Sequence, residues 1–215
     1  MPGHVRVNRA EAASEMITEL VVASSNAGKL REISRILAPL NIEATPQSAF
    51  AISDAAEPHP TFVENALAKA RHASASCHLP ALADDSGICV DALGGAPGVH
   101  SARYADQAGE PRCDARNNRR LLEALRGIED RAAHYVCVMV LVRHANDPQP
   151  LIVEAEWHGV IAGEPRGANG FGYDPLFVIP ELGKTAAEIP LDQKNAISHR
   201  GRALTLLADK LVRFG

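Results

Sequence analysis

Apolar and polar positions along the chain predict alternating strands and helices, typical of an α/β protein. Residues 19–23, apolar from Leu20 onward, predict a short strand, and apolar residues then recur at helical spacing over 30–37 until Pro39 ends the pattern. The β-rich runs 132–142 and 151–161 are separated by a short polar segment. This arrangement predicts a long antiparallel hairpin.

Three further segments predict helices. Thr61 followed by Glu64 forms a capping-box pattern that opens an alanine-rich helix. The pattern over 112–125 predicts a basic amphipathic helix, and leucines at helical spacing over 204–211 predict a final helix. We expect this final helix to begin near Lys194.

The stretch 80–104 places acidic residues directly after an apolar run. Residues 80–83 read as the end of a buried strand, and Asp84 and Asp85 follow. Ligands of open α/β sheets bind beyond the carboxyl ends of strands, and two neighbouring carboxylates suit Mg²⁺. The same residue types also favour a solvated turn. Taken alone, the stretch is compatible with either a metal site or a turn.

Small residues between the first strand and the first helix indicate an anion site over 24–29. Free backbone N–H groups and the positive end of the helix dipole would point at the ligand there. The glycine spacing is not that of a Walker loop or a dinucleotide fingerprint. An ordinary N-cap by Ser25 or Asn26 would explain the same residues. Both interpretations stay open and can hold together.

Two later segments also indicate a ligand. The glycine-rich segment 163–175 carries two aromatics and an aspartate, although aromatic residues make up only 4% of the chain. Lys194, His199 and Arg200 cluster at the expected start of the final helix, where the helix dipole favours acids rather than cations. These cations suggest that something anionic binds beside them.

Length and charge set limits on the fold and on its partners. The 215 residues suffice for one large domain or two small lobes, and we expect a frayed or disordered N-terminal tail over 1–18 before a single domain over 19–215. The net charge of −4 gives no support for binding nucleic acid or an anionic membrane.

Cysteine usage and apolar segments bear on location. The four cysteines are scattered without a CxxC spacing, which argues against a zinc site and a disulfide scaffold. No apolar segment is long enough to span a bilayer, and the first residues lack the apolar core of a secretory signal. We therefore expect a cytoplasmic protein.

Together these segments resemble the inosine triphosphate pyrophosphatase family, which acts on non-standard purine nucleoside triphosphates. The resemblance runs from about Leu20 to the C-terminus. It implies an elongated mixed β-sheet flanked by helices, with two lobes and a nucleotide cleft between them, usually in a homodimer. The implied reaction is the Mg²⁺-dependent hydrolysis of ITP, dITP or XTP to the monophosphate and pyrophosphate. The blocks that carry the resemblance are 24–29, 62–69, 83–104, 170–175, 183–188 and 194–200.

The resemblance also assigns roles to individual residues. Asp85 matches the family's proton acceptor and metal ligand, and Glu57, in an irregular loop, is our choice for the second acidic metal ligand. We expect Arg200, a protonated His199 or backbone N–H groups to donate to the 6-oxo group of the base. The residues expected to bind substrate are Ser24, Ser25, Asn26, Ala27, Gly28, Lys29, Lys69, Ser86, Phe171, Gly172, Tyr173, Asp174, Lys194, His199 and Arg200.

Two other functions are compatible with such a chain. One is a non-catalytic module that binds or senses nucleotides, which would not need a carboxylate such as Asp85 beside the metal. The other is a pyrophosphatase for other modified nucleotides, because fold alone does not define the base.

Overall fold

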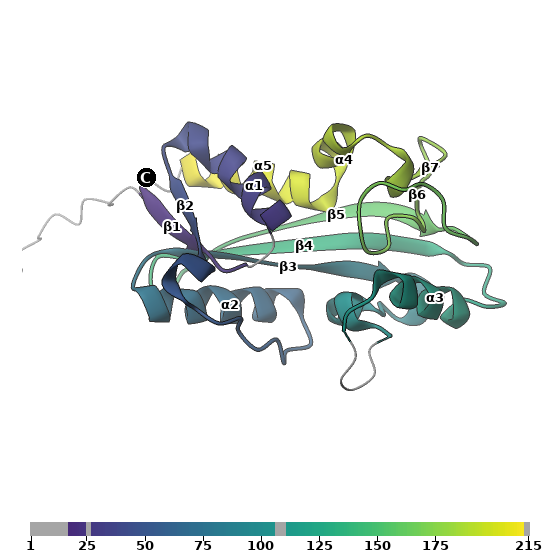
Figure 1. Ribbon diagram of the computed structural model, residues 1–215, viewed down its shortest axis with the longest axis horizontal. Helices are drawn as coiled ribbons and strands as arrows, with labels where there is room; N and C mark the ends of the chain where they lie inside the picture. The colour runs from purple at the N-terminus through teal and green to yellow at the C-terminus, as the bar shows by residue number, and fades with distance from the viewer. Residues whose placement is uncertain (1–16, 25–26, 106–110, 213–215) are drawn as a thin grey trace, which may run out of the picture.

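The computed structural model describes residues 17–24, 27–105 and 111–212, which build an elongated sheet with helices on both faces (Figure 1). The strands are β1 (Glu19–Val22), β2 (Glu43–Pro46), β3 (Ala81–Val90), β4 (Ala132–Val142), β5 (Leu151–Ile161), β6 (Phe177–Ile179) and β7 (Lys184–Thr185). The α-helices are α1 (Ala27–Leu37), α2 (Phe62–Cys77), α3 (Asp114–Ala124), α4 (Leu191–Ile197) and α5 (His199–Val212).

The sheet has the strand order β2-β1-β3-β4-β5-β6-β7. β1 is parallel to β2 and β3, and the remaining neighbours are antiparallel. β4 and β5 form the hairpin predicted from the sequence, with the predicted bounds. β1 pairs with β3 only at Val21 and Val22, so β3 continues well beyond the end of its parallel neighbour.

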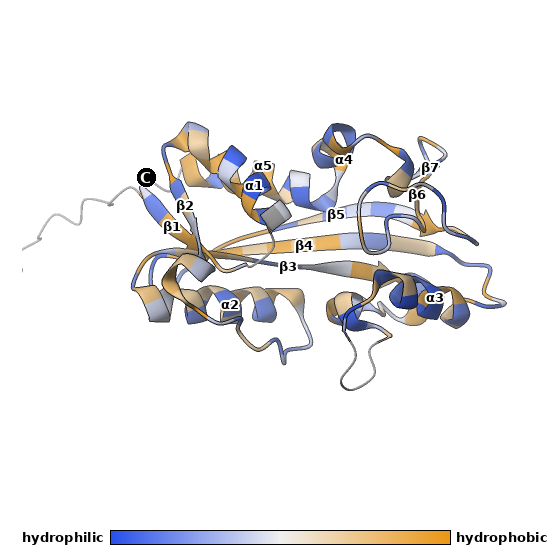
Figure 2. Cartoon of the chain, in the orientation of Figure 1, coloured by the Kyte–Doolittle hydropathy of each residue, from blue (hydrophilic) through white to orange (hydrophobic). Residues whose placement is uncertain are grey.

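Helices α1, α4 and α5 cover one face of the sheet, and α2 and α3 cover the other (Figure 1). Apolar residues are concentrated on the sheet, whereas α3 carries many hydrophilic ones (Figure 2). At one end, Ile33 and Leu207 belong to a core under α1 and α5, and Ala70 belongs to a second core under α2. At the other end, Leu121 of α3 packs with Phe177 in a third core. The chain therefore has two lobes that share the long strands β3–β5.

The helices predicted after Thr61 and over 112–125 are confirmed, with one difference in detail. Thr61 caps α2, because its hydroxyl accepts from the backbone N–H of Glu64 at 3.3 Å. The Glu64 carboxylate accepts a hydrogen bond of 2.6 Å from the same hydroxyl, rather than reaching the backbone of the cap. In α3, Leu121 is buried, and Leu125 lies buried just after the helix.

The folded part of the chain begins slightly earlier than predicted, within the expected tail. Residues 1–16 of that tail lie outside the described residues. Ile17 packs against the core under α1 and α5, and the carbonyl oxygen of Thr18 accepts a hydrogen bond of 2.8 Å from the backbone N–H of Glu43. Ile17 and Thr18 therefore belong with the folded chain.

The described residues contain no helix that is both long and apolar enough to cross a membrane. All four cysteines are free thiols.

Candidate functional site

The adjacent acids Asp84 and Asp85 lie in the middle of β3. The expectation that a strand ends just before them is wrong, and so is the solvated turn, because both residues are buried. Pairing with β4 carries the strand through the acidic segment, with Met139 opposite Asp84 and Val138 opposite Asp85. β1 ends at Val22, so the acids do lie beyond the carboxyl end of that neighbouring strand.

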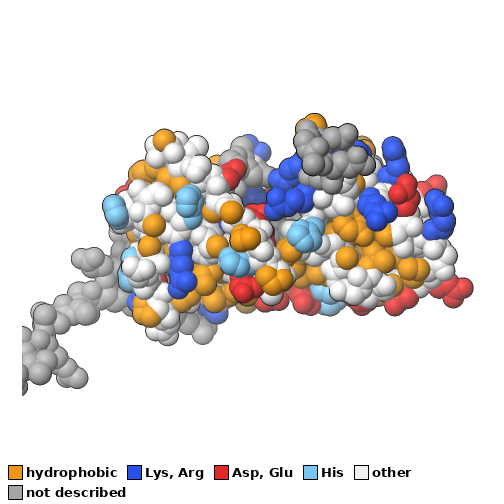
Figure 3. Space-filling model, turned by 90° about the horizontal axis from the view of Figure 1, so that it is seen from below, with side chains coloured by type: hydrophobic (Ala, Val, Ile, Leu, Met, Phe, Trp, Pro, Cys, Tyr) orange, Lys and Arg blue, Asp and Glu red, His pale blue; other side chains and the backbone are white. Residues whose placement is uncertain are grey.

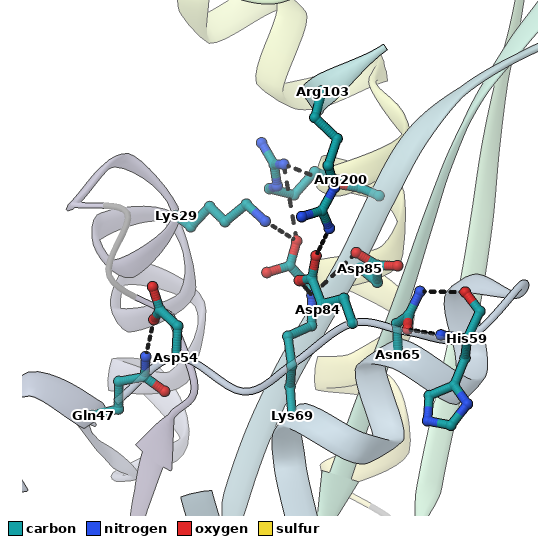
Figure 4. Close-up of polar contacts among 12 residues, drawn as sticks. Lys29, Gln47, Asp54, His59, Asn65, Lys69, Asp84, Asp85, Arg103 and Arg200 are labelled. Atoms are coloured by element: carbon teal, nitrogen blue, oxygen red, sulfur yellow. Dashed lines mark hydrogen bonds and ion pairs between the residues drawn. The ribbon is translucent and has the colours of Figure 1, made fainter. Parts of the chain in front are cut away.

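Asp84 faces the helices on the α1 side of the sheet. Lys29 Nζ lies 2.7 Å and an Arg200 nitrogen 3.9 Å from its Oδ2 atom (Figure 4). Burial alone would raise the pKa of Asp84, but the charges of Lys29 and Arg200 outweigh burial and lower this pKa to about 2. Asp84 is thus a buried anion that holds cations from two separate helices.

Asp85 faces α2, because successive side chains of a strand point to opposite faces. Lys69 Nζ lies 3.1 Å from Asp85 Oδ1 and 2.8 Å from Glu57 Oε1, while Arg103 lies 2.8 Å from Glu57 Oε2. Burial raises the pKa of Asp85, helped by the negative charges of Glu57 and Asp84 and opposed by Lys69. Burial pushes the Glu57 pKa upward too, but Lys69 and Arg103 hold it below its ordinary value. Lys69, Asp85 and Glu57 all line the cleft that is described below.

Glu57 and Asp85 are the carboxylates placed to hold a cation. The Lys69 ammonium lies between them, and Oδ2 of Asp85 is buried without a hydrogen-bond partner in the described part of the chain. Among those residues, no three His, Cys, Asp or Glu side chains gather as a metal cage. Mg²⁺ needs no such cage, because it takes one or two carboxylates and completes its shell with water and phosphate oxygens. The pair therefore fits Mg²⁺ bound together with a phosphate.

Ser24, just after β1, and Lys29, in the first turn of α1, both line the cleft. Residues 25 and 26 lie outside the described residues, so the roles expected for them stay predictions. Helix α1 begins at Ala27, has Gly28 in its first turn, and carries no acid in that turn. The positive end of its dipole is therefore not offset by a carboxylate of its own first turn.

The loop over 170–174 brings an aromatic ring to the other end of the cleft. Phe171 is 58% exposed, and Lys194 Nζ lies 5.0 Å from the centre of its ring. Tyr173 is buried and donates from its hydroxyl to the Ser101 carbonyl oxygen at 2.8 Å. Asp174 is also buried; it pairs with Lys194 and accepts from the Phe171 backbone N–H at 2.9 Å. Phe171 thus offers its side chain to a ligand, whereas Tyr173 and Asp174 hold the loop in shape.

The expected single helix from Lys194 onward is wrong. The chain is extended at Ser198, which separates α4 from α5. Gly201 allows the two helices to meet, because a Cβ atom there would lie 1.7 Å from a backbone carbonyl oxygen of α4. Lys194 therefore comes from a different helix than His199 and Arg200, and all three line the cleft.

His199 is a buried, neutral ring. It stacks on Tyr135 with 4.7 Å between ring centres, and the buried Trp157 stacks at 6.4 Å. Burial lowers the pKa of His199 well below its ordinary value, and the charges of Arg200 and Lys194 lower it further. The expected protonated His199 is therefore wrong. The neutral imidazole still has one donor and one acceptor nitrogen.

Acid is expected to destabilise the fold through His199. The folded pKa lies below that of the unfolded chain, about 6.5, so its stabilising contribution is complete above pH 6.5 and is lost as the pH falls. Between pH 7.5 and 5.5, the wild type should lose about 1 kcal/mol more unfolding free energy than His199→Phe, which keeps an aromatic ring. Urea denaturation at both pH values measures this. Equal losses in the two proteins would contradict the prediction.

Several residues of the cleft were not predicted from the sequence. A signal existed for two of them: Arg103 lies in the block 83–104 that resembles the family, and Asp54 shares the irregular loop with Glu57. No local signal marked Tyr135, which looks like one more residue of a β-rich run. The cleft residues missed in this way include Glu32, Gln47, Asp54, Arg103, Asp114 and Tyr135.

The acids and cations described above line one cleft together with Phe171, and its volume is about 600 Å³. Such a volume is typical of sites for small organic ligands. Seen from below, a hollow near the middle of the molecule brings Lys and Arg side chains next to acidic ones (Figure 3). Ser86 also lines the cleft, and its hydroxyl accepts a hydrogen bond of 3.3 Å from Arg200. The cleft therefore combines buried acids, several cations and an exposed aromatic ring.

Comparisons with known proteins agree with this picture. The model of the Ham1 family matches residues 20–210. A curated protein of Nitrosomonas europaea named dITP/XTP pyrophosphatase is 64% identical over 195 residues, which are 91% of this chain and 95% of that protein.

Two solved structures are similar over nearly the same range. A HAM1 protein from Coxiella burnetii has a TM-score of 0.87 at 49% identity, covering 92% of this chain and 100% of that one. The Staphylococcus aureus Ham1 protein has a TM-score of 0.84 at 38% identity, with the same coverage. The resemblance drawn from six sequence blocks is confirmed, and the chain belongs to the Ham1 family.

Proposed function

We propose that the protein hydrolyses non-standard purine nucleoside triphosphates such as ITP, dITP and XTP to the monophosphate and pyrophosphate. One observation carries the proposal: in a single cleft, Asp85 lies with Glu57 and Lys69 among cations from several helices, and Phe171 is exposed at the far end. The name of the 64% identical relative supports the same substrates.

The cations of the cleft suit a triphosphate, which carries about four negative charges and would bind poorly in a partly dry site without compensation. The lysines of the cleft already have carboxylate partners: Lys29 pairs with Asp84, Lys69 with Asp85, and Lys194 with Asp174. These acids orient the cations before substrate arrives. The phosphates would then share the cations. The net charge of −4 does not reveal this local concentration of positive charge.

We assign Mg²⁺ binding to Asp85 and Glu57. When bound there with the substrate, Mg²⁺ would polarise the phosphoryl oxygens and offset their charge. Lys69, between the two carboxylates, would shift toward the phosphates as one of their ligands.

Asp85 would act as the general base. It orients a water molecule and removes its proton as the oxygen attacks the α-phosphorus. The bond from the α-phosphorus to the bridging oxygen breaks, and pyrophosphate leaves with the bonding electrons. The raised pKa of Asp85 makes it a better proton acceptor than an exposed aspartate. Lys29, Lys69 and Arg200 would supply the remaining rate acceleration by positioning the substrate and stabilising its charge.

The far end of the cleft would read the base. Hypoxanthine and xanthine carry an oxygen at position 6, where adenine carries an amino donor. Arg200 can only donate and His199 can donate from one nitrogen, so the pair would favour the 6-oxo group. Phe171 offers a ring face for stacking. Each mismatched donor would cost adenine roughly 1–3 kcal/mol.

Pyrophosphate release tests the proposal directly. With Mg²⁺, release from ITP and XTP should exceed release from dATP and dGTP at least about tenfold, and EDTA should abolish it. If ITP bound without any pyrophosphate appearing, a sensing module would be the better description. Faster release from methylated pyrimidine triphosphates would instead indicate a pyrophosphatase for other modified nucleotides.

We also propose a cytoplasmic homodimer that binds neither nucleic acid nor membranes. The four free thiols are consistent with a reducing compartment. Light scattering on purified protein measures the oligomeric state, and a monomeric mass would contradict the dimer.

A further inference from the structure

Helix α3 holds the loop that carries Phe171. Asp114 and Asn118 stand four residues apart, so they lie on the same face of α3. Asp114 Oδ2 accepts a hydrogen bond of 2.7 Å from the backbone N–H of Gly172, and Asn118 Nδ2 donates one of 2.9 Å to the Gly172 carbonyl oxygen. One helix therefore holds both backbone polar groups of a single loop residue.

The loop needs such external contacts to have a defined shape. Gly170 and Gly172 flank Phe171, both have positive φ angles, and neither has a side chain to pack. Asp174 binds the Phe171 backbone N–H from the buried side, and α3 binds Gly172 on the other. Phe171 therefore lies between two anchors, and its exposed ring takes its position from them.

We infer that Asp114 and Asn118 are positioning residues, which fix the Phe171 ring where a purine base binds and thereby set affinity for the base. The inference rests on the proposed function, because it takes the base as the ligand of Phe171. In the described contacts, Asp114 and Asn118 bind the loop and not the group around Asp85. Their loss should therefore affect KM rather than kcat.

Asp114 is well suited to a test, because truncating it leaves the core of α3 intact. It is exposed in the first turn of the helix, whereas Leu121 carries the buried contact. Asp114→Ala removes the acceptor for the Gly172 N–H. Asp114→Asn keeps an oxygen acceptor of the same shape and loses only the charge. Glu123→Ala is a matched control, since it removes an exposed acid from the other end of α3.

Steady-state kinetics with dITP and Mg²⁺ should separate these variants. We expect Asp114→Ala to raise KM about tenfold with kcat within about twofold, the scale of one lost hydrogen bond to a charged group. Asp114→Asn should return KM to within about threefold of the wild type. Glu123→Ala should match the wild type, and the melting temperatures of all four proteins should agree within about 2 °C.

A double variant tests whether Asp114 acts through the ring. If it does, Asp114→Ala should raise KM far less in a Phe171→Ala background than in the wild type, because the two changes remove the same contact. If the two substitutions raised KM independently, so that their factors multiplied, the inference would be overturned. A wild-type KM for Asp114→Ala, or a decrease in kcat alone, would also overturn it. A wild type that releases no pyrophosphate from dITP would instead overturn the proposed function.

Discussion

Replacing Asp85 with Asn is expected to lower the turnover of ITP at least about a hundredfold while the protein still folds. The amide has nearly the same shape but cannot take a proton from water. Lys69 keeps Glu57 as a partner at 2.8 Å, so the substitution leaves no buried cation without an anion. Pyrophosphate release under saturating ITP measures turnover, and urea denaturation checks the fold.

Asp91 provides the control for this variant. It is an exposed acid directly after β3 that does not line the cleft, so Asp91→Asn should keep wild-type turnover. Near-normal turnover in Asp85→Asn would show that another group takes the proton, with Asp84 or Glu57 next in line.

The largest effect on stability is expected at Asp84. Asp84→Asn should lower the free energy of unfolding by about 3 kcal/mol, the scale for breaking a buried ion pair by removing one partner. The carboxyl is 2% exposed, and its loss leaves Lys29 without this anion and Arg200 with Glu32 at 3.7 Å. Urea denaturation at pH 7 measures the loss, and a value under about 1 kcal/mol would contradict the prediction.

A second substitution separates charge from packing at this position. Adding Lys29→Met to Asp84→Asn also removes the cation that Asp84 offsets, so part of the stability should return. Losses that simply add would indicate that Asp84 acts through packing rather than through its charge.

Much of the fold follows from local patterns in the sequence. The hairpin of β4 and β5 was predictable because two long β-rich runs flank one polar turn. Helix α2 was predictable because Thr61 and Glu64 mark its start. These signals need no information beyond a few neighbouring residues.

The chemistry of the site depends on contacts between distant segments, and the sequence was less informative there. Asp84 and Asp85 look like a turn because polar residues rarely occupy a buried strand, and cations from other elements make their burial tolerable. His199 looks like a cation beside Arg200, but Tyr135 and Trp157, from strands far away in the sequence, bury its ring. The residue types predicted the kind of ligand. The ion-pair partner of each charged residue could be identified only from the fold.

Because side chains alternate along β3, the register of the strand determines which face of the sheet each of its two acids occupies. Asp84 and Asp85 are neighbours that serve opposite faces of the sheet, one toward Lys29 and the other toward Lys69. A slip of a single residue would turn each acid to the wrong face. The ladder with β4, paired from Ala81 to Val90, opposes such a slip along its whole length. Pairing with β4 thus keeps Asp84 on the α1 side of the sheet and Asp85 on the α2 side.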